Sequence, residues 1–236
     1  MNMSSPNPKR ALYAQFAAVA KALAHEHRLE LLELVAQGER TVETLAERCG
    51  ITIANTSQHL QHLRRAGLVS ARRDGKFVRY ALADDTVLAA ISGVHRVAER
   101  NVAEVNRILR SYFLQRDELE AVSRKELQER MKKGLVTLLD VRPEDEFRLG
   151  HLPGAVNVPL SKLRSWLLRT GKKAEIVAYC RGPYCVMSFE AVAELRAKGF
   201  KARRLEDGFP EWKAAGLPVK TGLATGPAPH RAKAGP

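Results

Sequence analysis

The sequence predicts a two-domain protein, with an α-rich first half containing one β-hairpin and an α/β second half with a parallel sheet flanked by helices. Three observations support this prediction. Apolar residues recur at helical spacing over 11–66, an alternating segment at 69–82 contains the turn signal Asp74-Gly75, and strand-like and helix-like segments alternate from Val136 onward. A chain of 236 residues is long enough for two cores.

The composition indicates a soluble, cytoplasmic protein. Three cysteines are too few for a disulfide framework, which favours a reducing compartment. The N-terminus has no apolar signal region, and no apolar run approaches the roughly 18 residues of a membrane span. The net charge of +13 favours a nucleic-acid partner, and the basic residues cluster locally over 55–82.

Caps, stops and spacing place the elements of the first half. Residues 1–10 should be disordered, and a domain should follow over 11–114. Two helices are expected within 11–37 with a break at 25–27, and two more should begin at Thr41 and Thr52 and stop at Gly50 and Gly67. After the hairpin, 84–114 should form one long amphipathic helix. Its apolar stripe has no cover in this half, which favours a dimer contact.

A charged linker at 115–122 should lead to a second domain over 123–220, and the Gly-, Ala- and Pro-rich tail at 221–236 should be disordered. Ser123 and Glu126 form a capping box. Strands are expected at 136–141, 155–158, 175–179 and 202–205. Helices are expected between the first two strands and at 160–168, 186–198 and 210–215.

Two helices joined by a short turn and followed by a basic hairpin form a winged helix-turn-helix, whose second helix, near 52–66, would enter the major groove. Its polar residues can bond base edges: Asn55, Thr56, Ser57, Gln58, His59, Gln61 and His62. The basic residues suit phosphates or the minor groove: Arg64, Arg65, Arg72, Arg73, Lys76 and Arg79. A solvated helix and a charged hairpin without a ligand are the alternative.

The segment LAERCGITIANTSQHLQHLRRAGLVSARRDGKFVRYAL resembles the ArsR-type family of bacterial repressors, and the resemblance covers about 10–113. It implies a homodimer through the helix at 84–114, binding to a double-stranded DNA operator, and derepression by an inducer. Some members sense metals, but the helix at 41–48 has no cysteine in its body. The pattern laid from Asp84 meets Thr86, Val97 and Arg100, so we expect no metal.

Two further groups in this half have alternative roles. His95 and Glu99 lie four residues apart in the predicted long helix and are either a remnant ligand pair or exposed polar residues at a dimer edge, and we favour the second. Cys49 stands at a helix end, where a small buried apolar residue is the expected role.

In the second half, Cys180 directly follows an apolar strand and precedes a helix from about Val186. Backbone N–H groups and the helix dipole favour an anion at such a loop, and both lower the pKa of a thiol there. Cys180 is therefore a candidate nucleophile.

Three stretches resemble the rhodanese family over about 118–220: LLDVRPEDEFRLGHLPGAVNVPL, YCRGPYC and LEDGFPEWKAAGLPV. The resemblance implies a rhodanese-like sheet in which Cys180 takes up sulfane sulfur as a persulfide and passes it to an acceptor. Backbone N–H groups along the loop would bind the anion, with Arg181 as a cationic partner. The loop residues are Arg181, Gly182, Pro183, Tyr184, Cys185 and Val186. Asp140 and Arg142 would build the scaffold.

The loop also bears on related chemistries. Cysteine phosphatases and arsenate reductases of this shape need Cys-x5-Arg, and Val186 stands where the arginine belongs, so both are unexpected. No cofactor is expected. The neutral Pro183 and Tyr184 leave the donor open between thiosulfate and a persulfide. Cys185 either resolves a Cys180 persulfide or packs behind the loop, and we favour packing.

The two resemblances together suggest a repressor whose operator affinity follows reactive sulfur. Two alternatives stay open at this stage. One is a sulfurtransferase with the winged helix as a recruitment module, and the other is a repressor with an idle rhodanese domain that only binds an anion.

Overall fold

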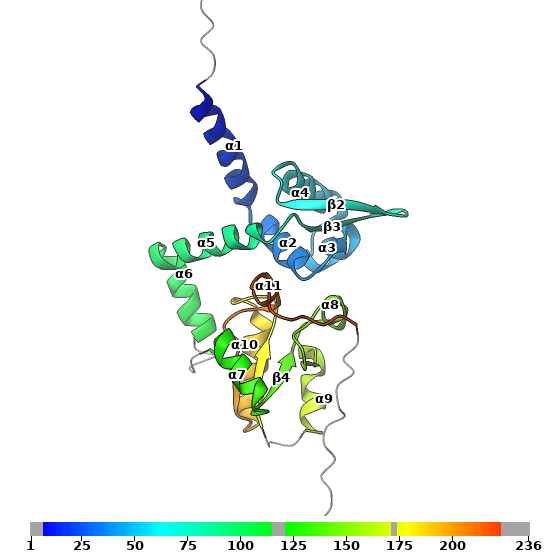
Figure 1. The fold of residues 1–236 in the computed structure, drawn as a ribbon, viewed down its shortest axis with the longest axis vertical. Helices are drawn as coiled ribbons and strands as arrows, with labels where there is room; N and C mark the ends of the chain where they lie inside the picture. The colour runs from blue at the N-terminus through cyan, green and yellow to red at the C-terminus, as the bar shows by residue number, and fades with distance from the viewer. Residues whose placement is uncertain (1–6, 115–120, 171–173, 223–236) are drawn as a thin grey trace, which may run out of the picture. The chain divides into compact units, whose positions relative to one another are not determined.

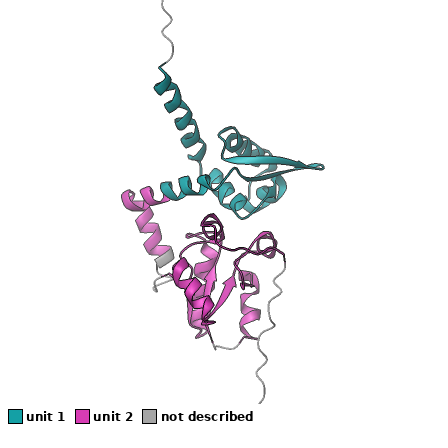
Figure 2. Cartoon of the chain, viewed as in Figure 1, with its two compact units in different colours: residues 1–94 teal, residues 95–236 magenta. Residues whose placement is uncertain are grey.

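The computed structural model describes residues 7–114, 121–170 and 174–222. The chain divides into two compact units, Met1–Val94 and His95–Pro236 (Figure 2). We expected the first domain to run to residue 114, whereas the segment from His95 onward groups with the second unit. The predicted linker at 115–122 lies outside the described residues except for its last two, and so does the predicted tail from 223 onward.

Unit 1 contains α1 (Pro8–Leu23), α2 (Glu26–Ala36), β1 (Arg40–Thr41), α3 (Val42–Cys49) and α4 (Ile53–Arg65), followed by the start of α5 (Thr86–Asn101). The predicted caps are confirmed. The Thr41 hydroxyl accepts from the Thr44 N–H at 3.4 Å, and the Thr52 hydroxyl accepts from the Asn55 N–H at 3.2 Å. Gly50 ends α3 with φ at 66°, a conformation that glycine adopts without strain.

The predicted hairpin is confirmed as β2 (Val69–Asp74) and β3 (Phe77–Leu82), with Gly75 at φ 60° in its turn. It forms a three-stranded antiparallel sheet in the order β1-β3-β2, and its tip extends beyond the helices of the unit (Figure 1). Leu60 and Leu63 of α4 are fully buried with Leu31, Leu32 and Leu45. Each such side chain contributes about 1.5–3 kcal/mol to folding. Because α4 turns its leucines inward, its polar face points to solvent.

Two expectations for the helices were wrong. α1 begins at Pro8, within the segment 1–10 that we expected to be disordered, and the Asn7 side chain caps it. The predicted long helix is broken at Val102, whose φ of −110° and ψ of 106° are extended. It continues as α6 (Ala103–Ile108) and a π-helical turn, η1 (Leu109–Leu114). The side chains of Asn101 and Asn106 donate to the carbonyls of Val97 and Glu99 at 2.8 and 2.7 Å, which satisfies the freed end of α5.

The rest of unit 2 is an α/β domain. Its strands are β4 (Val136–Asp140), β5 (Val156–Asn157), β6 (Glu175–Tyr179) and β7 (Ala202–Arg204), parallel in the order β5-β4-β6-β7. Its helices are α7 (Arg124–Lys132), α8 (Glu144–Leu149), η2 (Leu160–Lys162), α9 (Leu163–Leu167), α10 (Val186–Ala197) and α11 (Phe209–Ala214). The predicted parallel sheet flanked by helices is confirmed (Figure 1).

Both faces of this sheet are buried. Leu139 and Ile176 pack with residues of α9 and α10, while Leu138 and Val177 pack with residues of α7, α8 and α11. Parallel strands covered on both faces need continuous apolar runs, as in Ile176-Val177-Ala178. Because β4 and β6 are paired in parallel, they end side by side at Asp140 and Tyr179. Loops at this edge of a parallel sheet commonly form ligand sites.

In the part of the chain that the structure describes, no helix has both the length and the apolar character needed to cross a membrane.

Candidate sulfur site and nucleic-acid interface

The loop between β6 and α10 holds the two cysteines. The structure pairs Cys180 and Cys185 as a disulfide with Cα atoms 6.1 Å apart, within the range of ordinary disulfides. Cys180 is 1% exposed and Cys185 is 7% exposed. Cys185 occupies the N-cap position of α10, so both sulfur atoms lie at the N-terminal end of a 12-residue helix, where the dipole favours negative charge.

Backbone contacts hold this loop in place. The Phe209 N–H donates to the Cys180 carbonyl at 3.0 Å, the Cys185 N–H donates to the Gly182 carbonyl at 3.2 Å, and the Ser188 hydroxyl donates to the Cys185 carbonyl at 2.9 Å. A Cβ on Gly208 would lie 2.3 Å from the Gly182 nitrogen. Gly208 is therefore required by a close backbone approach, a role that the sequence motif alone did not reveal.

The Arg181 guanidinium is directed at Glu146. Its Nε and Nη2 donate to the Glu146 carboxylate at 3.0 and 2.7 Å, and Glu146 is only 1% exposed. Such a two-pronged arginine–carboxylate pair fixes the loop and offsets the charge of Arg181. The expected role of Arg181 as a partner for anionic sulfur stays a prediction, and it has to compete with this ion pair.

Asp140 and Arg142 lie beneath the loop and are fully buried. Arg142 Nη2 donates to Asp140 Oδ2 at 2.6 Å and to the Gly150 carbonyl at 2.7 Å, and its guanidinium lies 4.4 Å from the centre of the Phe209 ring. Burial, reinforced by the Asp140 carboxylate, raises the pKa of Tyr179, so its hydroxyl stays protonated. This arrangement fits the scaffold role that the rhodanese resemblance implied.

Tyr184 points from the loop toward the helical segment of its own unit. Its hydroxyl donates to the Glu99 carboxylate, and its ring meets the His95 ring edge-on at 5.1 Å. Burial lowers the pKa of His95, although Glu99 opposes that shift. His95 and Glu99 are thus half-buried against Tyr184. Among the described residues, no group of three or more His, Cys, Asp or Glu is placed to hold a metal ion.

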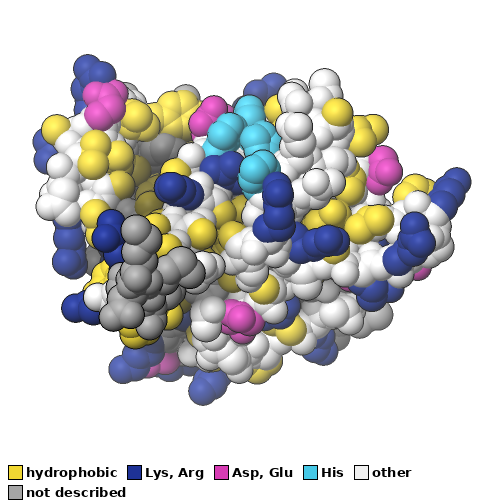
Figure 3. All heavy atoms as spheres, turned by 90° about the horizontal axis from the view of Figure 1, so that it is seen from above, with side chains coloured by type: hydrophobic (Ala, Val, Ile, Leu, Met, Phe, Trp, Pro, Cys, Tyr) yellow, Lys and Arg dark blue, Asp and Glu magenta, His cyan; other side chains and the backbone are white. Residues whose placement is uncertain are grey.

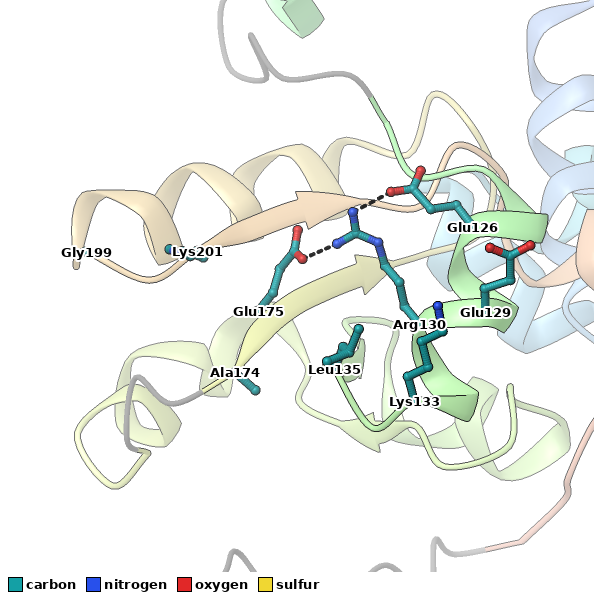
Figure 4. Close-up of a pocket in the computed structure, with 9 residues that line it drawn as sticks. All are labelled: Glu126, Glu129, Arg130, Lys133, Leu135, Ala174, Glu175, Gly199 and Lys201. Atoms are coloured by element: carbon teal, nitrogen blue, oxygen red, sulfur yellow. Dashed lines mark hydrogen bonds and ion pairs between the residues drawn. The ribbon is translucent and has the colours of Figure 1, made fainter.

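A cavity of about 720 Å³ lies at the opposite end of the sheet from the cysteines, beside Glu175 at the start of β6 (Figure 4). Arg130 extends between Glu126 and Glu175 and pairs with both. Lys133 and Lys201 also line it. Its position and its internal ion pairs separate it from the sulfur chemistry.

The candidate DNA-reading helix, α4, presents most of its predicted residues to solvent. Asn55, Gln58, Gln61, His62, Arg64 and Arg65 are exposed, and Ser57 and His59 are half-buried. Thr56 corrects the prediction, because it is fully buried and its hydroxyl donates to the Thr52 carbonyl at 2.9 Å. It stabilises the helix start and has no access to DNA.

A histidine cluster and the wing border this helix. The ring centres of His25 and His59 are 4.5 Å apart, and histidines gather beside Lys and Arg on one face (Figure 3). Of the predicted wing cations, Arg72, Arg73 and Lys76 are exposed and Arg79 is half-buried. Arg72 Nε donates to Glu39 at 3.1 Å, and Arg79 Nε donates to Asp74 at 2.6 Å, which lowers the pKa of Asp74.

Comparison with known proteins matches both units. Residues 23–71 match the model of a helix-turn-helix domain, and residues 123–215 match that of a rhodanese-like domain. Among solved structures, the chain is similar to the homodimeric winged helix-turn-helix DNA-binding domain of Mb0332 from Mycobacterium bovis, a possible ArsR-family regulator. The identity is 41%, over 43% of this chain and 94% of that one, with a TM-score of 0.39. It is also similar to a rhodanese-related protein from Thermoplasma volcanium, at 26% identity over 43% of this chain and 98% of that one, with a TM-score of 0.39.

One relative matches nearly the whole chain. The HTH-type transcriptional regulator Rv0324 of Mycobacterium tuberculosis is 44% identical over 218 residues, which cover 92% of this chain and 96% of the relative. Both units and the connection between them are therefore shared. The chain belongs to the family of ArsR-type winged helix-turn-helix transcriptional regulators that carry a C-terminal rhodanese-like domain.

Proposed function

We propose that this regulator is a homodimeric, DNA-binding repressor that takes up reactive sulfur at Cys180 and thereby changes its affinity for an operator. The observation that carries the proposal is the pairing of Cys180 with Cys185 at the N-terminal end of α10. The same chain exposes a polar helix, α4, and a basic wing. A reversible sulfur reaction and a DNA-reading surface thus belong to one polypeptide.

The first chemical step is sulfur transfer to Cys180. Its thiolate attacks the outer sulfur of a donor persulfide, the S–S bond of the donor breaks, and the donor thiolate leaves. With thiosulfate the leaving group is sulfite. Cys180 then carries a persulfide, and neither route needs an external oxidant because the donor already holds sulfane sulfur.

The second step is resolution by Cys185. Its thiolate attacks Cys180 Sγ, the persulfide bond breaks, hydrosulfide leaves, and the Cys180–Cys185 disulfide forms. The transferred sulfur is reduced as the two cysteines are oxidised, so the electrons balance. The Cα separation of 6.1 Å supports this role over the packing role that the sequence favoured. Two equivalents of a low-molecular-weight thiol restore the dithiol.

The proposed dimer is supported by exposed apolar residues that a second copy of the chain could cover. Val97 on α5, Val102 at the break and Ile108 on α6 are 63%, 45% and 49% exposed. Tyr13 and Phe16 on α1 are also more than half exposed. Exposed apolar helix faces favour association, and a two-fold dimer would present two α4 helices to two half-sites of DNA.

A gel shift on the protein's own promoter tests this function, with and without a persulfide donor and with Cys180→Ser alongside. We expect the donor to weaken binding of the unmodified chain by about tenfold or more, and to leave Cys180→Ser unaffected. Unchanged binding of the unmodified chain, or an identical response of the variant, would contradict the proposal.

A sulfurtransferase enzyme is the second candidate, and the burial of Cys180 behind Cys185 disfavours rapid turnover. Comparing steady-state sulfur transfer with single-turnover loading of Cys180 separates the two, because a sensor needs only one turnover. Mass spectrometry of Cys180 after donor treatment also tests the idle-domain alternative, which predicts no added sulfur.

A further inference from the structure

A small apolar cavity lies where Tyr184 meets the helical segment of unit 2. It has a volume of about 250 Å³, and besides Tyr184 it is lined by Ala98, Val105, Ile108 and Leu109. The Tyr184 hydroxyl donates to the Glu99 carboxylate and the Tyr184 ring packs edge-on against His95, and both of these residues also line the cavity. The hydrogen bond at its hydroxyl and the ring contact together hold the Tyr184 side chain in one position.

These contacts span the break at Val102. Glu99 and Ala98 belong to α5, whereas Val105, Ile108 and Leu109 follow the break in α6 and η1. The Asn106 side chain crosses the same break to the Glu99 carbonyl at 2.7 Å. Tyr184 bonds to the part before the break and shares an apolar cavity with the part after it, so an arrangement that keeps this cavity closed favours one angle between the two parts.

The position of Tyr184 depends on the cysteines. It directly precedes Cys185 in the ring that the disulfide closes. The other side of the loop is fixed by Phe209 N–H on Cys180 and by the close approach of Gly208 to Gly182. When the disulfide opens, the side of the loop that carries Tyr184 loses its covalent restraint and is held by the hydrogen bonds from the Cys185 N–H to Gly182 and from the Ser188 hydroxyl to Cys185.

We propose that Tyr184 is the contact through which the bonding state of Cys180 and Cys185 sets the joint at Val102 and so acts on α5. This inference rests on the proposed function, since it names how sulfur reaches the DNA-binding unit. α5 is continuous from Thr86, and Val87 at its start is buried in the core of unit 1. We therefore expect a change at Glu99 to be transmitted along this one helix.

Hydrogen exchange of the full-length chain in its disulfide and dithiol forms tests the contact. We expect amides within 95–112 to exchange about tenfold faster in the dithiol form, since a hydrogen bond to a charged group and its ring contacts are released. Glu99→Ala should abolish this difference, and Glu99→Gln should restore much of it because the amide oxygen still accepts. Glu104→Ala is the matched control, because that carboxylate pairs with Arg107 on the same segment.

The outcomes are separable from those of the proposed function. A full difference in Glu99→Ala, or no difference in the unmodified chain, overturns the inference even if the operator responds to sulfur. If exchange responds to the disulfide while operator affinity does not, the contact stands and the proposed function fails. Loss of both responses in Glu99→Ala, with both kept in Glu104→Ala, supports the two together.

Discussion

α4 and the loop that follows β6 differ in what holds them in place and in how exposed their functional side chains are. α4 is held by a local cap and a row of buried leucines, and its polar side chains extend into solvent. The cysteine loop is held by contacts from distant parts of the chain, and its reactive atoms are buried. A surface that reads a large partner needs exposed side chains on a rigid support. A site for a small reactive group needs an enclosing backbone.

The buried pair beneath the loop should give the largest effect. Asp140→Asn leaves the Arg142 guanidinium buried without its carboxylate, and we expect unit 2 to lose about 3–5 kcal/mol of unfolding free energy. The double variant Asp140→Asn with Arg142→Met should recover much of this loss, because no unpaired charge remains. Denaturant unfolding measures both, and equal losses in the two would show that charge burial is not the cause.

Gly208→Ala should displace the loop at a smaller cost. The backbone φ of −105° suits any residue, so the penalty is steric and amounts to about 1–3 kcal/mol as the Gly182 backbone is pushed away. Loading of Cys180 with sulfur should fall, while DNA binding by the dithiol form is retained. Normal loading in Gly208→Ala would contradict the role of this close backbone approach.

On α4, a buried and an exposed polar residue should separate stability from DNA affinity. Gln58→Ala should reduce operator affinity by about 1–3 kcal/mol and leave the melting temperature nearly unchanged. Thr56→Ala should lower stability by about 1 kcal/mol, because its hydroxyl bonds the Thr52 carbonyl. Titration of DNA and calorimetry on both variants measure this, and reversed effects would show that the face of α4 is assigned wrongly.

The smallest expected effect concerns pH. Burial, with help from the neighbouring His25, Arg28 and His27, lowers the pKa of His59. The unfolded chain then binds the proton more tightly than the folded one, so unit 1 loses stability as pH falls below about 6.5 and keeps it above. His59→Gln should flatten this acid limb in thermal melts from pH 8 to pH 5. If the loss of melting temperature at low pH is the same in His59→Gln, groups other than His59 cause it.

Local signals predicted much of the fold, and distant contacts account for what was missed. The side chains of Thr41 and Thr52 cap helix starts, and the backbone of Gly50 ends a helix, so each of these ends could be predicted from one residue. Asp74-Gly75 likewise predicted the hairpin turn. The break at Val102 was missed because the apolar stripe runs through it. The side-chain amides that stabilise the break only show their role in three dimensions.

The same distinction holds for the candidate sites. The motif pointed to Cys180, but Arg181 and Glu146 are 35 residues apart in sequence, and Tyr184 and Glu99 are 85 apart. Such pairs have no spacing rule, so the sequence could not associate them. Thr56 looked like its exposed neighbours because a hydroxyl is equally suited to bonding a base or its own helix.

In the proposed function, the Cys180–Cys185 bond would persist after the sulfur donor that caused it has gone. A ligand held by noncovalent contacts leaves when its concentration falls, so a protein that binds one reports only the present. A covalent bond persists until a thiol reduces it, and cysteine residues that are 1% and 7% exposed admit a reductant slowly. If the proposed function holds, the protein therefore reports past exposure to sulfur, for a time set by how fast thiols reach the loop.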